Sequence, residues 1–408
     1  MAKWKLSLMC FLGTIFMINC GGCDNKMKSA FEKDVEFLKN HTDAIVLAEP
    51  AGQARVAVVP QYQGRVMTST IGGDSNSSFG WINKELISSG QLQKHINVFG
   101  GEDRFWMGPE GGQFAIFFEK GDPFDLEHWQ TPALFDTEPF KLVSRSQDRA
   151  YFQKRGHLKN YSQTSFDVEI SRTVRVLGRD QAQQKLNCPI PSEVKLVAYE
   201  SENKLTNCGS KAWNKDSGLL SIWILGIFKH SPKTTIVIPF HAGTVEELGP
   251  KVNADYFGRV PDDRLIVRDN VLFFKADGKY RSKIGLSPLR AKSVLGSYDG
   301  VNNVLTLVTY NQVDTAKNYV NSAWEIQKFP YKGDVVNAYN DGPPSPGKKP
   351  FGPFYELETS SPAFELAPAQ SIVHIHSTYH FQGPVKELSR IAEATLGVTV
   401  SDIEQSFN

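Results

Sequence analysis

Short runs of apolar and β-branched residues recur from residue 44 to about residue 380, and polar and apolar positions alternate within many of them. Alternation at period two is typical of strands with one buried face, whereas helices repeat every 3.6 residues. Turn signals rich in Gly, Pro and Asp, such as residues 119–123 and 276–278, separate the runs. Because helical interruptions are few, the pattern predicts an all-β protein, a large antiparallel β-sandwich rather than an α/β fold.

Helical periodicity is found mainly at the two ends of this region. Apolar residues at helical spacing among charged ones predict a short amphipathic helix over residues 27–40, and residues 81–87 suggest a helical turn. A C-terminal helix is predicted to begin at Pro384, to end at Gly397 and to pack on the sandwich. We therefore divide the chain into a signal peptide (1–19), a tether with a short helix (20–45), the β-sandwich (46–382) and the C-terminal helix (383–408).

The N-terminus has the pattern of an export signal. Lys3 and Lys5 precede an apolar run over residues 6–18, which is too short to span a bilayer comfortably. The run closes on Cys20 and resembles a bacterial lipoprotein signal, in which that cysteine is lipidated. Cys23 is the alternative site, and an ordinary secretory signal is the alternative interpretation. The pattern predicts an exported lipoprotein, held at a membrane in the periplasm or at the cell surface.

Composition and charge narrow the class of partner. Hydrophobic residues make up 40% of the chain and the net charge is +1, which fits a globular protein and offers no basic excess for nucleic acid. Of the five cysteines, only Cys188 and Cys208 lie beyond the signal region, flanking two runs that read as a paired hairpin. In an oxidising compartment these two predict a possible disulfide, with two unpaired buried thiols as the equal alternative.

Two alternating runs near the C-terminus carry the side chains of general acid/base catalysis. In residues 354–359, Glu356 and Glu358 share one strand face, and in the following run His374 and His376 share one face. If these strands are neighbours, carboxylates and imidazoles lie side by side. A carboxylate with the two histidines could also bind a metal, but no third ligand is fixed by spacing. We therefore predict no metal and no cofactor.

A glycine-bordered segment supplies candidates for ligand binding. Arg104, Trp106 and Glu110 alternate within it, and an Arg with an indole suits sugar recognition, since the guanidinium donates to hydroxyls and the ring stacks on a pyranose. The alternative is that Trp106 belongs to the core and Arg104 pairs with an acid.

Three further side chains are candidates at the rim of such a site. Arg281 and Lys283 share one strand face, which suggests a clamp for an acidic or sulfated sugar or else a solvated edge strand. Trp324 lies in a polar and aromatic segment that reads as a loop rim.

Three segments resemble the galactose-mutarotase-like β-sandwich proteins, the superfamily of the aldose 1-epimerases, and in particular its uncharacterised bacterial exported members. They read GGEDRFWMGPEGG (100–112), SENKLTNCGSKAW (201–213) and FYELETSSPAFELAPAQSIVHIHSTYH (354–380). The resemblance implies a sheet that faces carbohydrate, and it implies that Glu358 is the catalytic base.

The resemblance leaves the catalytic acid open. The chain lacks the His-Pro-Tyr-Phe-Asn motif whose His is the acid in aldose 1-epimerases. We therefore take His376 or His374 as the acid and place Glu356 among the groups that bind the sugar. The first hypothesis is an aldose 1-epimerase-like isomerase acting by general acid/base catalysis. The alternative is a non-catalytic glycan-binding surface lipoprotein.

Overall fold

The computed structural model describes Met1 and residues 28–50, 52–73, 76–311, 317–345 and 347–408. Apart from Met1, the predicted signal peptide (1–19) lies outside the described residues, as do Cys20 and Cys23, so export and lipidation stay predictions. Within the described ranges, none of the helices combines the length and the apolar character that crossing a membrane requires.

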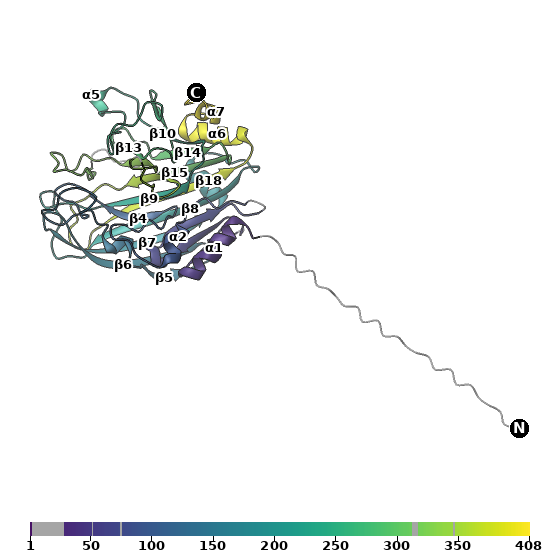
Figure 1. The fold of residues 1–408 in the computed structure, drawn as a ribbon, viewed down its shortest axis with the longest axis horizontal. Coiled ribbons are helices and arrows are strands. Elements are labelled where there is room, and N and C mark those ends of the chain that lie inside the picture. Colours follow the sequence, from purple (N-terminus) through teal and green to yellow (C-terminus); the bar gives the residue numbers. More distant parts are fainter. Residues whose placement is uncertain (2–27, 51, 74–75, 312–316, 346) are drawn as a thin grey trace.

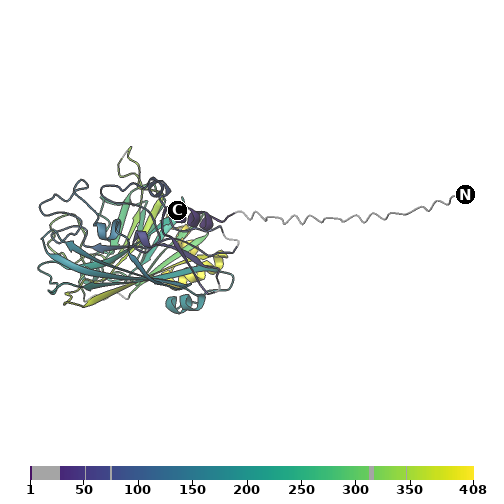
Figure 2. The ribbon, with the colours of Figure 1, turned by 90° about the horizontal axis from the view of Figure 1, so that it is seen from below.

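The larger of two facing sheets has ten antiparallel strands in the spatial order β11-β12-β10-β14-β15-β18-β8-β7-β6-β5 (Figure 1). Seen along the layers, its long strands form one side of the molecule (Figure 2). In chain order these strands are β5 (Lys141–Arg145), β6 (Arg149–Lys159), β7 (Ser165–Leu177), β8 (Lys195–Asn207), β10 (Thr234–Pro239), β11 (Leu265–Val267), β12 (Val271–Lys275), β14 (Val294–Asp299), β15 (Val304–Tyr310) and β18 (Ser371–Gln382).

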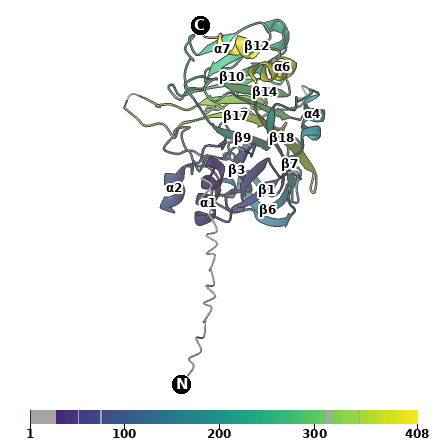
Figure 3. The same ribbon diagram turned by 90° about the vertical axis from the view of Figure 1, so that its right-hand side faces the viewer.

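The smaller facing sheet has five antiparallel strands in the order β13-β16-β17-β9-β4. A separate three-stranded sheet, β1-β2-β3, lies beside α1 near the N-terminal end of the fold (Figure 3). The strands of these two sheets are β1 (Ile45–Ala48), β2 (Arg55–Val59), β3 (Arg65–Thr70), β4 (Arg104–Gly108), β9 (Ser221–Lys229), β13 (Ser282–Leu286), β16 (Val336–Asn340) and β17 (Phe354–Ser360). The structure thus confirms the predicted all-β antiparallel sandwich.

The core lies between the two large sheets and follows from the alternation along their strands. Tyr355 and Leu357 of β17 point inward and join a cluster with Ile236 and Leu295 of the ten-stranded sheet. The hydroxyl of Tyr355 also bonds to Ser297 Oγ across the gap at 2.7 Å. Burying each such apolar side chain contributes roughly 1.5–3 kcal/mol to folding, which holds the two sheets together.

Helices cap the ends of the sandwich. A Ser29–Glu32 capping box starts the predicted N-terminal helix, and Gly397, at φ 75°, ends the predicted C-terminal helix. Figure 1 shows α6 and α7 at one end of the fold and α1 at the other. The helices are α1 (Ala30–His41), α2 (Lys84–Ser89), α3 (Ala133–Asp136), α4 (Arg179–Leu186), α5 (Val245–Leu248), α6 (Val385–Leu396) and α7 (Val400–Glu404), with a 3-10 turn at Pro60–Tyr62.

The prediction of a possible disulfide between Cys188 and Cys208 is wrong. Both Cys188 and Cys208 are free thiols, the first buried and the second exposed. The segment predicted to be a hairpin is one continuous strand of 13 residues, β8, and the two cysteines lie beyond its opposite ends. At about 3.3 Å per residue the strand spans about 40 Å, whereas a disulfide needs Cα atoms within roughly 7 Å.

Candidate functional site

Charged and aromatic side chains gather on the outer face of the five-stranded sheet, the face turned away from the ten-stranded sheet. Alternation along β17 sends Leu357 and Thr359 into the core and leaves Glu356 and Glu358 on the outer face. The strand register places Arg104 of β4 in the same row as Glu358, two strands away. We use the term charged face for Arg104, Trp106, Trp223, Lys283, Glu356 and Glu358, together with Glu110 from the loop that follows β4.

Glu358 is the most buried carboxyl group of the charged face, with 0% of its surface exposed. Its Oε2 accepts hydrogen bonds from Lys283 Nζ at 2.9 Å and from Trp223 Nε1 at 3.0 Å. Its Oε1 is buried without a hydrogen-bond partner among the described residues. Because burial removes the hydration of a carboxylate, the ammonium and the indole N–H stabilise the charge on one oxygen.

Glu356 lies two residues away on the same face and is held differently. Arg104 Nη2 donates to its Oε1 at 3.1 Å, and the guanidinium stacks over the Trp106 ring, 4.3 Å from its centre. Burial raises the pKa of Glu356, and so does the nearby Glu358, whereas the positive charge of Arg104 lowers it. The net result is a pKa of about 8. Glu356 is therefore protonated at neutral pH and can donate a proton.

Glu110 reaches the charged face from a loop. Its backbone N–H donates to Ser322 Oγ at 3.1 Å, which ties this loop to the segment that carries Trp324. Burial raises the pKa of Glu110 to about 7, although the ammonium of Lys283 acts in the opposite direction. A carboxyl group with such a pKa exchanges its proton near neutral pH.

Aromatic rings line the same region. Trp106 is buried and lies against Trp223 and Trp129, with ring centres 5.4 and 6.4 Å apart. Trp129 in turn stacks on Trp324 at 6.0 Å. The structure therefore places Trp106 in a packed cluster and pairs Arg104 with the carboxyl group of Glu356, as the alternative interpretation of this segment expected. Both side chains border the carboxyl groups.

Five buried polar atoms of this region lack hydrogen-bond partners in the part of the chain that the structure describes. They are Glu358 Oε1, Arg104 Nε, Trp106 Nε1, Trp129 Nε1 and Ser221 Oγ. All five belong to side chains that are more than nine-tenths buried. An unpaired buried polar group costs about 1–3 kcal/mol, so such a cluster is typical of a place where a polar ligand completes the bonding. Three N–H donors, an acceptor and a hydroxyl suit a ligand with several hydroxyl groups.

The predicted pairing of the glutamate and histidine strands is wrong. β17 pairs with β16 and β9 in the five-stranded sheet, whereas β18 pairs with β15 and β8 in the ten-stranded sheet. His374 and His376 lie between the sheets, where Thr359 Oγ1 bonds to His374 Nε2 at 2.8 Å and His376 Nδ1 at 2.9 Å. Since neighbouring residues of a strand point to opposite faces, Thr359 meets the imidazoles and Glu358 points away from them.

The surroundings of the two histidines do not suit the role of an acid. Burial lowers the pKa of His374 to about 3 and that of His376 to about 4, so both imidazoles are neutral near pH 7. Across the described ranges, no three His, Cys, Asp or Glu side chains are placed to hold a metal ion together.

Comparison with protein families assigns this chain over nearly its whole length. Residues 29–407 match the model of a family of unknown function, DUF6786. The chain belongs to this family. No curated protein sequence matches it.

Several solved structures are similar to this DUF6786 chain in fold at low sequence identity. A putative aldose 1-epimerase from Escherichia coli K12 is 11% identical, with a TM-score of 0.47, and the match covers 83% of this chain and 98% of that one. A galactose mutarotase-like protein from Lactobacillus casei is 10% identical, with a TM-score of 0.46 and coverage of 83% and 100%. The Slr1438 protein from Synechocystis is 13% identical, with a TM-score of 0.47 and coverage of 83% and 96%. We take no activity from these matches.

Sequence reasoning missed the indoles of Trp223 and Trp129. Trp223 lies in the run GLLSIWILGIF of β9, whose continuous apolar character hides which residues face outward. Trp129 comes from an irregular loop with no periodicity to read. Alternation did place Lys283, Glu356 and Glu358 on strands, as the structure has them.

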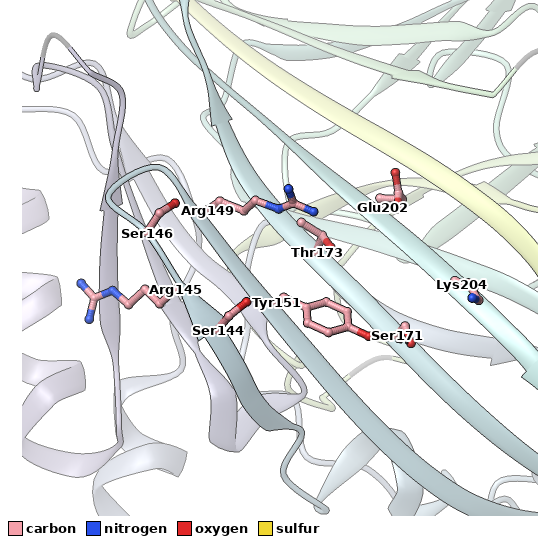
Figure 4. A pocket seen from close by; sticks show the side chains of 9 residues that line it. All are labelled: Ser144, Arg145, Ser146, Arg149, Tyr151, Ser171, Thr173, Glu202 and Lys204. Carbon is pink, nitrogen blue, oxygen red and sulfur yellow. Dashed lines mark hydrogen bonds between the residues drawn. The ribbon is translucent and has the colours of Figure 1, made fainter.

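A hollow of about 590 Å³ lies elsewhere, on the outer face of the ten-stranded sheet (Figure 4). We use the term open face for the nine residues that line it. These are Ser144, Arg145, Ser146, Arg149, Tyr151, Ser171, Thr173, Glu202 and Lys204. Arg149, Glu202 and Lys204 are exposed there, so water can solvate these charges and no chemistry is implied.

Proposed function

We propose that the charged face binds a sugar and that the protein is an aldose 1-epimerase-like isomerase. The observation that carries this proposal is the state of Glu358. Lys283 and Trp223 hold one of its oxygens, while the other is buried and has no hydrogen-bond partner among the described residues. The indoles beside it offer flat apolar surfaces for a pyranose ring, and Arg104 Nε, also without a partner in the described ranges, can donate to a hydroxyl. The sequence resemblance to galactose-mutarotase-like proteins points to the same glutamate.

The reaction needs one base and one acid on the sugar. Glu358 takes the proton of the anomeric hydroxyl while the acid gives a proton to the ring oxygen, so the bond between C1 and the ring oxygen breaks and an open-chain aldehyde forms. Rotation about the C1–C2 bond exposes the other face of the aldehyde. The ring closes by reversal of both proton transfers, and no proton is gained or lost overall.

Glu110 is our candidate for the acid, and Glu356 is the second candidate. Glu110 comes from the loop after β4 rather than from the sheet, so a sugar bound between loop and sheet would have a carboxyl group on each side. Its pKa of about 7 lets it give and regain a proton near neutral pH. Glu356 also carries its proton at neutral pH, but its oxygen is engaged by Arg104.

Polarimetry on several aldoses tests the proposal. We expect the wild type to accelerate anomer interconversion, and we expect Glu358→Gln to lose about 10²- to 10⁴-fold of that acceleration. Glu110→Gln and Glu356→Gln separate the two candidate acids, because only loss of the acid lowers the rate to a similar extent. Glu202→Gln on the open face is the matched control and keeps the wild-type rate.

The outcomes separate the isomerase from a non-catalytic glycan-binding protein. The missing His-Pro-Tyr-Phe-Asn motif favours that second function. A wild type that binds glycans without accelerating anomerisation would overturn the isomerase and leave the binding protein. Acceleration that persists in Glu358→Gln would overturn only the choice of base.

A further inference from the structure

An exposed cluster of two aromatic rings and an arginine lies at the rim of the charged face. Phe257 is 47% exposed and Phe351 is 49% exposed, which is unusual for phenylalanine in a protein that buries most of its aromatic side chains. The guanidinium carbon of Arg281 lies 4.2 Å from the centre of the Phe257 ring and 5.6 Å from that of Phe351. We use the term aromatic rim for these three side chains.

The aromatic rim is continuous with the charged face. Arg281 Nε donates to the hydroxyl of Tyr339 at 3.2 Å, and Tyr339 lies opposite both Glu356 and Lys283 in the strand register. Arg281 directly precedes β13, the strand that carries Lys283, so the two side chains are two positions apart in the chain. A ligand held at Glu358 and extended by one more unit therefore reaches the aromatic rim.

The positive charge of Arg281 in the aromatic rim is available to a ligand, whereas that of the neighbouring Lys283 is not. Lys283 is engaged by Glu358. Arg281 forms no ion pair with any carboxylate of the described residues, and it uses Nε for its hydrogen bond to Tyr339. Asp341 is the acid behind it, and that carboxylate accepts a hydrogen bond from the Tyr339 hydroxyl at 2.7 Å instead. As far as the described residues show, the two terminal nitrogens of the Arg281 guanidinium have no partner, so they can bind an anion through two hydrogen bonds.

We propose that the aromatic rim is a subsite for a sugar unit that carries a negative charge and is linked to the sugar at Glu358. The two phenylalanine rings stack on the apolar faces of that unit, and Arg281 binds its carboxylate or sulfate. The substrate class is then an acidic oligosaccharide rather than a free neutral monosaccharide. This inference rests on the proposed sugar site at the charged face.

Calorimetric titration with three disaccharides of one backbone tests the subsite. One disaccharide ends in a uronic acid, one carries a sulfate on that unit and one is neutral. We expect the wild type to bind at least one charged disaccharide about tenfold more tightly than the neutral one, since hydrogen bonds to charged groups are strong. The preferred charged probe identifies carboxylate or sulfate as the anion.

Variants show whether the preference arises at the aromatic rim. Arg281→Gln is expected to abolish it, and Phe257→Ala to weaken binding of all three disaccharides, while Arg149→Gln on the open face changes neither. A preference that survives Arg281→Gln in a variant with an unchanged melting temperature, or no preference in the wild type, would overturn the subsite.

The same titrations in Glu358→Gln separate this inference from the proposed function. Charge preference that remains while anomerisation is absent, even in the wild type, supports the subsite and contradicts only the isomerase.

Discussion

The charged face and the open face both carry charged side chains, but only those of the charged face include buried ones. On the open face, Arg149, Glu202 and Lys204 stand in solvent. On the charged face, Glu358 is 0% and Arg104 is 4% exposed. Alternation places polar side chains on the outer side of either sheet, so alternation alone does not distinguish the charged face from the open face.

The difference in burial between the charged face and the open face comes from two loops. The loop after β4 supplies Glu110 and Trp129, and a later loop supplies Trp324; Gln113 and Gln327 join the two loops by hydrogen bonds, of which one measures 2.9 Å. Under this cover, burial raises the pKa of Glu356 to about 8 and that of Glu110 to about 7. Carboxyl groups with pKa values displaced toward neutral pH are typical of catalytic sites, so the cover, rather than the charge, distinguishes the face at which we propose the sugar site.

The largest expected effect is on stability, and it appears when the removal of a cation from the charged face is compared with the removal of one from the open face. Lys283→Met leaves Glu358 buried without its ammonium, and breaking a buried ion pair in this way typically costs about 3–5 kcal/mol of unfolding free energy. Lys204→Met, on the open face, should change it by no more than about 0.5 kcal/mol. Urea denaturation followed by circular dichroism measures both.

A double variant tests whether the loss of stability in Lys283→Met comes from the unpaired charge of Glu358 or from lost packing. If the unpaired charge is the cause, Lys283→Met combined with Glu358→Gln should be clearly more stable than Lys283→Met alone. Equal stability of the two would show that Lys283 acts through packing, for instance through its contact with the Trp223 ring, and not through charge.

The strands and their faces could be predicted because each depends on local pattern. Alternation in FYELETS is enough to put Glu356 and Glu358 on one face, and Gly397 is enough to end the last helix. Which strands pair is a different matter, because pairing depends on connections between distant segments. The Pro-containing turn after β17 leads to the other sheet instead of closing a hairpin, and no local signal distinguishes these two paths.

For the same reason the proposed acid could not be found from sequence. The imidazoles of His374 and His376 suit that role only if β18 neighbours β17, and β18 pairs with β15 and β8 instead. Glu110 is separated from Glu358 by 248 positions, and its raised pKa depends on burial within a loop of irregular structure. Alternation at period two carries no information about such a loop, so the sequence predicts Glu110 as a ligand-binding residue and not as a proton donor.

The next largest effect concerns pH. Burial raises the pKa of Glu356 to about 8 in the folded protein, whereas an unfolded chain has its Glu pKa near 4.3. Between these values the folded state keeps a proton that the unfolded state has lost. Stability therefore falls as pH rises from about 4.5 to about 8, by up to roughly 1 kcal/mol per pH unit for this carboxyl group.

Denaturation at pH 5, 6.5 and 8 measures how the unfolding free energy changes with pH, and variants show which carboxyl group causes the change. Glu356→Gln should flatten this dependence, because the amide does not titrate. Glu202→Gln should leave it unchanged, since an exposed carboxyl group changes little on folding. Stability of the wild type that rises over this range would contradict the burial of a neutral Glu356.

The smallest expected effect belongs to the open face itself. The double variant Arg149→Gln with Glu202→Gln should change the unfolding free energy by less than about 0.5 kcal/mol, because these solvated side chains form no ion pair within the described part of the chain. Its rate of anomer interconversion should stay within about twofold of wild type. A tenfold loss in polarimetry would instead make the 590 Å³ hollow part of the working site. In that case exposure could no longer separate the two faces.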